Sequence, residues 1–144
     1  MSTEEMVIQA RELSKLIHQE QTDQEGNPHY EYLNALAEDC YFDEMKAVAY
    51  LQDAVEHQPD RISIGDIRRQ FGDEIGDAVD AITRRPRESS EDYYVRLKQN
   101  PLALGVKMKD LRRRIADLEK TDADENVTRA RREAYQASLH YFMN

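Results

Sequence analysis

The chain has 144 residues and a mass of 16.8 kDa, which is enough for one domain with one buried core and too little for two. Its 29 acidic and 20 basic residues give a formal net charge of -9, which excludes a globally basic nucleic-acid-binding protein. Residues 1–57 hold 13 acids and 3 bases, whereas residues 58–144 hold 16 acids and 17 bases, so we expect any anion-binding surface in the second half.

The first half of the chain has the apolar spacing of helices. Residues 3–20 predict one amphipathic helix, and Gly26 and Pro28 mark a break over residues 21–29. A short helix is predicted over residues 31–38. The stretch over residues 42–57 predicts one longer helix, apolar nearly all round and therefore central and buried. The apolar positions of the first helix are Met6, Ala10, Leu13, Leu16 and Ile17.

The second half continues in the same way. Ser63 is a predicted N-cap for a helix that ends at Gly72, and Asp73 begins the next, which runs through Arg85 to a stop at Pro86. Three more helices follow, and no convincing strand is present. The sequence therefore predicts an all-α fold, a single domain over residues 1–144 with about seven or eight helices. The last three predicted helices are Ser90–Gln99, Pro101–Glu119 and Asp124–Phe142.

The order of several segments resembles a known family. The segments are EGNPHYEYL, AVAYLQDAVEH, ISIGDIRRQFGDEIGDAVDAITRR, NPLALGVKMKD and RREAYQASLHYF, spread over roughly residues 18–142. In this order they are similar to the HD-domain hydrolases, and most of all to the small stand-alone relatives of the RelA/SpoT alarmone hydrolases. That family removes pyrophosphate from the 3′ position of guanosine tetraphosphate and pentaphosphate. The resemblance implies a single HD-like helical bundle.

The resemblance also implies four metal ligands, of which two are present. A G-x-P-Y-x-x-H-P loop corresponds to Gly26–Leu33, and Tyr32 stands in place of its histidine. The His-Asp pair of L-H-D-x-x-E-D corresponds to Gln52 and Asp53, so this histidine is also replaced. The aspartate of V-K-L-A-D is kept as Asp110. Asp53 and Asp110 are therefore the residual metal ligands, and we expect the metal site to be empty.

Hydrolysis of this kind needs a divalent ion that lowers the pKa of a bound water. Two carboxylates without imidazoles bind manganese or magnesium weakly, and a phenol and an amide do not replace two histidines. Glu56 matches the acid/base position of the family and is the candidate catalytic residue. His29 and His57 fit no metal motif, so we expect them at the surface or in packing.

Four basic residues surround the last aspartate in the sequence, and two interpretations of them stay open. In the first, their salt bridges to Asp53 and Asp110 fill the space of the lost ion. In the second, they form a metal-free anion pocket that binds a phosphate, together with Tyr32 and Gln52. The four are Lys107, Lys109, Arg112 and Arg114.

Three functions follow from these patterns. The first is a catalytically degenerate HD-domain protein, not an active hydrolase, which binds a guanine nucleotide polyphosphate or a partner protein and needs no cofactor. The second is a weak metal-dependent nucleotide phosphohydrolase that uses manganese or magnesium. The third is an acidic inhibitor or adaptor, whose residues 1–57 face a basic partner. The oligomeric state, including a homo-oligomer, stays open.

The sequence also bears on location and on other partners. Its start has neither the charged nor the apolar region of a signal peptide, so we expect a cytoplasmic protein. No apolar run approaches ~18 residues, so no membrane partner is expected. The basic run after residue 106 lacks interleaved aromatic residues, and we expect no nucleic-acid partner.

Overall fold

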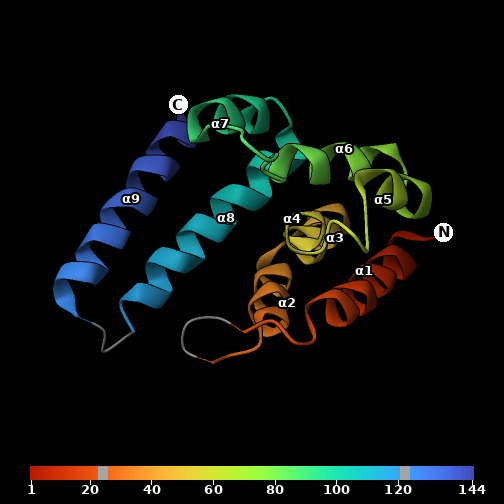
Figure 1. Ribbon diagram of the computed structural model, residues 1–144, viewed down its shortest axis with the longest axis horizontal. Coiled ribbons are helices and arrows are strands. Elements are labelled where there is room, and N and C mark those ends of the chain that lie inside the picture. The colour runs from red at the N-terminus through yellow and green to blue at the C-terminus, as the bar shows by residue number, and fades with distance from the viewer. Residues whose placement is uncertain (23–25, 121–123) are drawn as a thin grey trace.

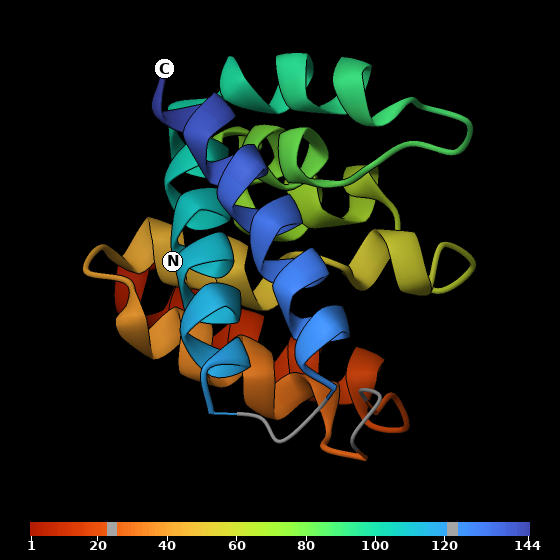
Figure 2. The same ribbon diagram turned by 90° about the vertical axis from the view of Figure 1, so that its left-hand side faces the viewer.

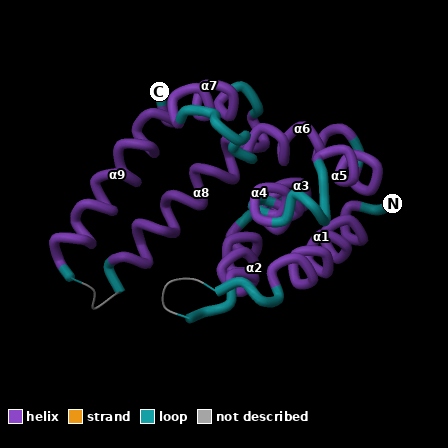
Figure 3. Tube along the Cα trace, in the orientation of Figure 1, coloured by secondary structure: helices purple, strands orange, loops and turns teal. Residues whose placement is uncertain are grey.

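Helices joined by short loops make up the protein, as the sequence predicts. The computed structural model describes residues 1–22, 26–120 and 124–144. Figure 3 shows helix and loop throughout these stretches, which contain no strand and confirm the all-α class. One of the helices is only a single turn.

An isolated antiparallel bridge between Thr22 and Pro28 closes the loop after the first helix. It lies within the break predicted over residues 21–29, of which residues 23–25 are outside the described part of the chain. The bridge brings the end of the first helix next to the start of the second. The side chains of His18, at the end of the first helix, and His29, at the start of the second, therefore lie side by side.

The helix α3 (Asp43–Leu51) lies at the centre of the fold. It packs against α1 (Thr3–His18) and α2 (His29–Asp39), and also contacts two helices of the second half (Figure 1). The side chain of Ser2 caps α1 by accepting a hydrogen bond from the backbone N–H of Glu5. The prediction of a central, buried segment is thus confirmed for α3.

The single long helix predicted over residues 42–57 is wrong, because the chain breaks it in two. After α3 ends at Leu51, Asp53 adopts the left-handed conformation with φ 70°, and α4 (Ala54–His57) begins as a new single turn. Aspartate is one of the few residue types that tolerate this conformation. A hydrogen bond from His29 holds its carboxylate there. A contact between distant parts of the chain is therefore present at the break.

The next two helices form a tight corner. In α5 (Ile64–Phe71), Ser63 and Asp66 make the reciprocal hydrogen bonds of a capping box. Gly72 has φ 91° and separates α5 from α6 (Asp73–Ile82), a conformation that favours glycine. The predicted N-cap and the predicted stop are both confirmed.

The helix α6 ends three residues earlier than predicted, at the approach of α7 (Ser90–Lys98). Arg96 of α7 donates hydrogen bonds to the backbone carbonyl oxygens of Asp80 and Thr83, at 2.7 and 2.8 Å. Its Nε and Nη2 also bind the two carboxylate oxygens of Glu88, at 2.9 and 2.8 Å. The guanidinium group of Arg96 thus satisfies backbone carbonyl groups at the end of α6 and connects this end to the loop before α7.

This cluster predicts a pH-dependent contribution to stability. The hydrogen bonds from Arg96 lower the pKa of Glu88 to about 2, from a usual value of 4.5. Because the folded pKa lies below the unfolded one, the stabilisation is present above pH 4.5 and is lost as pH falls through about 2. We expect Glu88→Gln to lower the melting temperature at pH 7, and the difference from the wild type to shrink below pH 4.

Thermal unfolding followed by circular dichroism across this pH range measures the effect. Glu133→Gln is the control, because Glu133 is exposed on α9, away from this loop, and its substitution should change the melting temperature little at either pH. A Glu88→Gln deficit that stays constant down to pH 2 would show that the carboxylate charge is not what stabilises the loop.

The last two helices, α8 (Pro101–Leu118) and α9 (Glu125–Met143), run antiparallel (Figures 1 and 2). Asn100 caps α8 by accepting a hydrogen bond from Ala103, and proline occupies the first turn, as predicted. The helix α9 buries little of its own surface. It packs on α8 and covers one side of the hollow described below.

The buried core surrounds α3. Apolar side chains from α1, α2, α5, α6, α7 and α8 meet it, and α9 contributes one aromatic ring near its end. No helix in the described residues has the length and apolar character that a bilayer crossing requires. The fully buried large apolar side chains are Leu33, Leu36, Val48, Leu51, Ile67, Val79, Leu97 and Val106.

Candidate functional site

A hollow of about 350 Å³ lies between the α3–α4 break and the helices α8 and α9. We call it the Lys107 pocket. Six of the nine site residues predicted from the sequence line this pocket. These six come from two well-separated stretches of the chain. These six are Gln52, Asp53, Glu56, Lys107, Asp110 and Arg114. The rest of its wall is Ile82, Arg84, Tyr93, Tyr94, Leu111, Ala134, Tyr135 and Ser138.

Helical spacing on α8 explains which basic residues reach this pocket. Lys107, Asp110 and Arg114 are three, four and seven residues apart, so they share one face. Lys109 and Arg112 point to a different face and line another hollow, of about 400 Å³. The structure therefore divides the four basic residues singled out from the sequence into two separate pairs.

Protein groups surround the carboxylate of Asp110, whose side chain is only 5% exposed. The Tyr32 hydroxyl donates a short hydrogen bond to its Oδ1, and Arg114 Nε donates to the same oxygen at 3.0 Å. Lys107 Nζ lies 4.0 Å from Oδ2. The guanidinium of Arg114 lies over the Tyr32 ring, 4.7 Å from its centroid. Three side chains thus satisfy one buried negative charge.

The protonation states in this cluster follow from burial and charge. Burial, with the neighbouring carboxylate of Asp110, raises the pKa of Tyr32 far above its usual value, so the phenol stays protonated. Burial alone would lower the pKa of Arg114, but the charge of Asp110 raises it overall. Tyr32 is therefore a neutral hydrogen-bond donor and Arg114 a fixed cation.

Asp53, the other residual carboxylate, has a different partner. Its Oδ2 lies 2.9 Å from His29 Nε2, a contact between residues 24 positions apart. Burial would raise the pKa of Asp53, yet the hydrogen bond and charge of His29 bring it below its usual value. The two aspartates therefore do not face each other as unpaired like charges. Each has its own positively charged or hydrogen-bonding partner.

The metal ion implied by the HD-domain resemblance does not fit the residues at its four expected positions. Tyr32 is a protonated donor, and an uncharged phenol is a poor ligand. Gln52 is a buried amide, 5% exposed, and supplies at most one weak carbonyl oxygen. Asp110 already binds Tyr32 and Arg114. The cation that balances Asp110 is therefore the protein's own arginine.

The structure also brings together residues that sequence reasoning did not connect. Of the chain's four histidines, His18, His29 and His57 lie close together, with ring centroids 4.9, 6.0 and 6.3 Å apart. His29 and His57 were expected at the surface or in packing, and His18 was not considered. Each histidine lies at a helix end, where no local motif would indicate the cluster.

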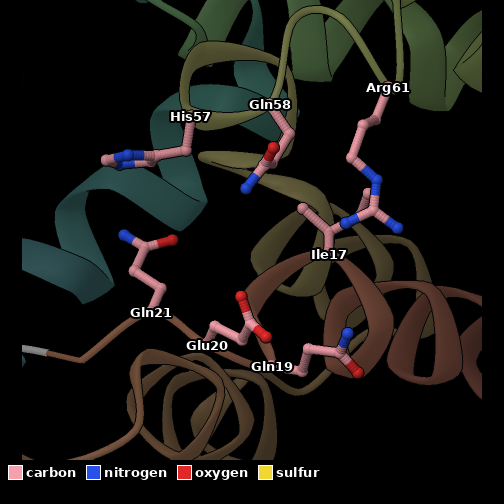
Figure 4. Close-up of a pocket in the computed structure, with 7 residues that line it drawn as sticks. All are labelled: Ile17, Gln19, Glu20, Gln21, His57, Gln58 and Arg61. Carbon is pink, nitrogen blue, oxygen red and sulfur yellow. The ribbon is translucent and has the colours of Figure 1, made fainter.

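Next to this cluster, Asp53, Glu56 and His57 each present a ligand atom, and these atoms all lie within 4.8 Å of one another. His57 also lines a second hollow, of about 270 Å³. Figure 4 shows His57 and Gln58 along one side of this hollow, with Glu20 and Gln21 from the segment after α1 opposite them.

Tyrosines of α7 form an aromatic wall of the Lys107 pocket. The Tyr93 hydroxyl donates a hydrogen bond to the backbone carbonyl oxygen of Ile82, and the centroid of the Tyr93 ring lies 5.9 Å from Lys107 Nζ. Tyr94 bonds Ser138 of α9 at 3.0 Å. The sequence contains these adjacent tyrosines, but nothing in it places them opposite α8.

The chain matches no model of a known protein family and no curated protein.

Proposed function

We propose that this protein is a catalytically degenerate relative of the HD-domain hydrolases that binds a phosphorylated nucleotide in the Lys107 pocket. The observation that carries the proposal is the engagement of Asp110 by Tyr32 and Arg114, which replaces the contact a catalytic ion would need. Without that ion no water is activated for hydrolysis. The pocket is lined by three cations, Arg84, Lys107 and Arg114, and these favour binding of an anion.

The cations of the pocket suit a phosphate group. Lys107 Nζ is only loosely paired with Asp110, at 4.0 Å, and a phosphate oxygen can compete for it. Arg84 is exposed at the rim, and Arg114 binds Asp110 through Nε. Among the described residues its Nη groups have no hydrogen-bond partner, so they can donate to a ligand. The carboxylates of Asp53 and Glu56 also line the pocket and repel an anion, so we expect its affinity for a phosphate group to be modest.

The aromatic wall suits a base. Tyr93, Tyr94 and Tyr135 line the pocket from α7 and α9, and stacking of one base on a tyrosine contributes about 1–3 kcal/mol. A volume of about 350 Å³ is within the range of small-molecule sites. Phosphate contacts on α8 and aromatic contacts on α7 and α9 together favour a nucleotide over free phosphate.

Thermal shift and titration calorimetry with guanosine tetraphosphate, GDP, ATP and pyrophosphate test the proposal. A ligand at 100 times its dissociation constant should stabilise the fold by about 2.7 kcal/mol. We expect Lys107→Gln to weaken nucleotide binding about tenfold or more, since it removes one charge-assisted phosphate contact. Lys109→Gln, two residues away on another face, is the matched control and should bind as the wild type does.

Two results would overturn the proposal. One is the absence of stabilisation by any of these nucleotides at millimolar concentration. The other is an equal loss in the Lys107→Gln and Lys109→Gln variants, which would indicate a general charge effect. Release of pyrophosphate from guanosine tetraphosphate by the purified protein would contradict the loss of hydrolysis.

A further inference from the structure

Two of the clustered histidines lie beside a group of possible metal ligands. An imidazole nitrogen binds zinc at ~2.1 Å, so each ring centroid lies about 3.2 Å from the ion, and two rings on a tetrahedral ion have centroids about 5.2 Å apart. The centroids of His18 and His57 are 6.3 Å apart, and His57 is exposed, so a rotation of its side chain can bring the pair to that separation. The ring of His29 lies 4.9 Å from His18 and 6.0 Å from His57, but His29 binds Asp53.

His18 provides an independent indication of a ligand. Its side chain is completely buried, and its Nδ1 lies 2.7 Å from Gln21 Oε1. The amide oxygen only accepts, so Nδ1 carries the proton and Nε2 has a bare lone pair. Nε2 is buried and has no hydrogen-bond partner among the described residues. A buried lone pair without a partner is costly, and a metal ion satisfies it.

The remaining donors lie on the break between α3 and α4. Ligand atoms of Asp53, Glu56 and His57 are all within 4.8 Å of one another, and two ligands of one tetrahedral ion are about 3.4 Å apart. Glu56 and His57 are exposed on a single helical turn, so a small side-chain rotation closes this gap. His29 holds Asp53 through Oδ2, as hydrogen-bond partners of metal-ligating carboxylates do.

We propose that a divalent transition metal ion, with zinc the best fit, binds where the end of α1 meets α4, held by His18 Nε2, Asp53, Glu56 and His57. His29 acts as a positioning residue for Asp53. Two imidazoles and two carboxylates are a donor set typical of zinc. Of the residues at the four HD-type metal-ligand positions only Asp53 takes part, and Asp110 stays with Arg114. The inference goes beyond the proposed nucleotide binding and does not depend on it.

The test uses the untagged full chain, stripped with chelator and titrated with zinc alone. We expect one zinc per chain by elemental analysis after dialysis, and a calorimetric dissociation constant that His57→Ala weakens about 100-fold. His57 is exposed, so this variant should fold. His140→Ala is the control, because the fourth histidine lies exposed on α9. It should bind zinc as the wild type does.

Cobalt supplies a readout of the donor set. Substitution with Co²⁺ should give the visible absorption of a four-coordinate site, and Glu56→Gln should change that spectrum. His29→Gln should weaken binding about 10–100-fold while the spectrum stays, because a positioning residue is not a ligand. A His29→Gln spectrum that changes as the Glu56→Gln spectrum does would overturn its assignment as a positioning residue.

Absence of stoichiometric zinc, or wild-type zinc affinity in His57→Ala, would overturn the site itself. The metal titration contains no nucleotide, and Lys107→Gln should leave zinc affinity unchanged. Failure of the metal site and failure of nucleotide binding are therefore distinguishable.

Discussion

Leu51→Ala should lower the free energy of unfolding by about 3–4 kcal/mol. The side chain of Leu51 is fully buried at the end of α3, in the core that joins this helix to its neighbours. Removing it costs both the transfer free energy of the lost carbons and the cavity that remains. Because Leu51 directly precedes Gln52 and Asp53, the change should also loosen the break that carries the site. Urea unfolding followed by circular dichroism measures the loss.

Leu16→Ala on α1 is the matched control. Leu16 is 51% exposed, and alanine is as good a helix former as leucine, so we expect a change within about 0.5 kcal/mol. A loss of less than 1 kcal/mol for Leu51→Ala would mean that the core is not centred on α3. A large loss for Leu16→Ala would show that this face of α1 is covered in solution.

The contrast between these two leucines shows what the sequence can predict of the fold. The spacing of apolar residues predicted the helix α1, but it also grouped Leu16 with Met6 and Ala10, which are buried. Periodicity indicates the direction of a buried face and not its width, because the width depends on which helices pack against it. Helix ends with a local cause, such as the Ser63 capping box and the Gly72 stop, were predictable.

The candidate site, like the fold, can be predicted from the sequence only in part. Lys107, Asp110 and Arg114 lie on one helix, and their spacing alone puts them on one face. The three histidines come from the ends of α1 and α4 and the start of α2, and only tertiary packing brings them together. The α3–α4 break also involves such a contact, since the carboxylate of the left-handed Asp53 binds His29. Local patterns contain no signal for contacts of this kind.

Arg114→Leu should lower the free energy of unfolding by about 2–3 kcal/mol. The carboxylate of Asp110 is buried, and loss of its cation leaves it with the Tyr32 hydroxyl and a distant Lys107. Breaking one side of a fully buried ion pair costs about 3–5 kcal/mol, and the partial exposure of Arg114 reduces that figure. Chemical unfolding of the two single variants and the double variant with Asp110→Asn measures the coupling.

The preceding residue on α8, Arg113, supplies the control. Arg113 pairs with Asp39 at 2.6 Å, but the Asp39 side chain is 51% exposed and its charge stays hydrated without a partner, so Arg113→Leu should cost at most about 1 kcal/mol. In the double variant, Asp110→Asn should recover part of the Arg114→Leu loss, because the unpaired charge is gone. That pattern would mean that Arg114 is the cation that neutralises Asp110. A ligand in the pocket would then compete with Asp110 for Lys107, and a ligand that does so is an anion. An Arg114→Leu loss no larger than that of Arg113→Leu would instead mean that Asp110 is solvated and free to bind a metal ion, which would restore the hydrolase hypothesis.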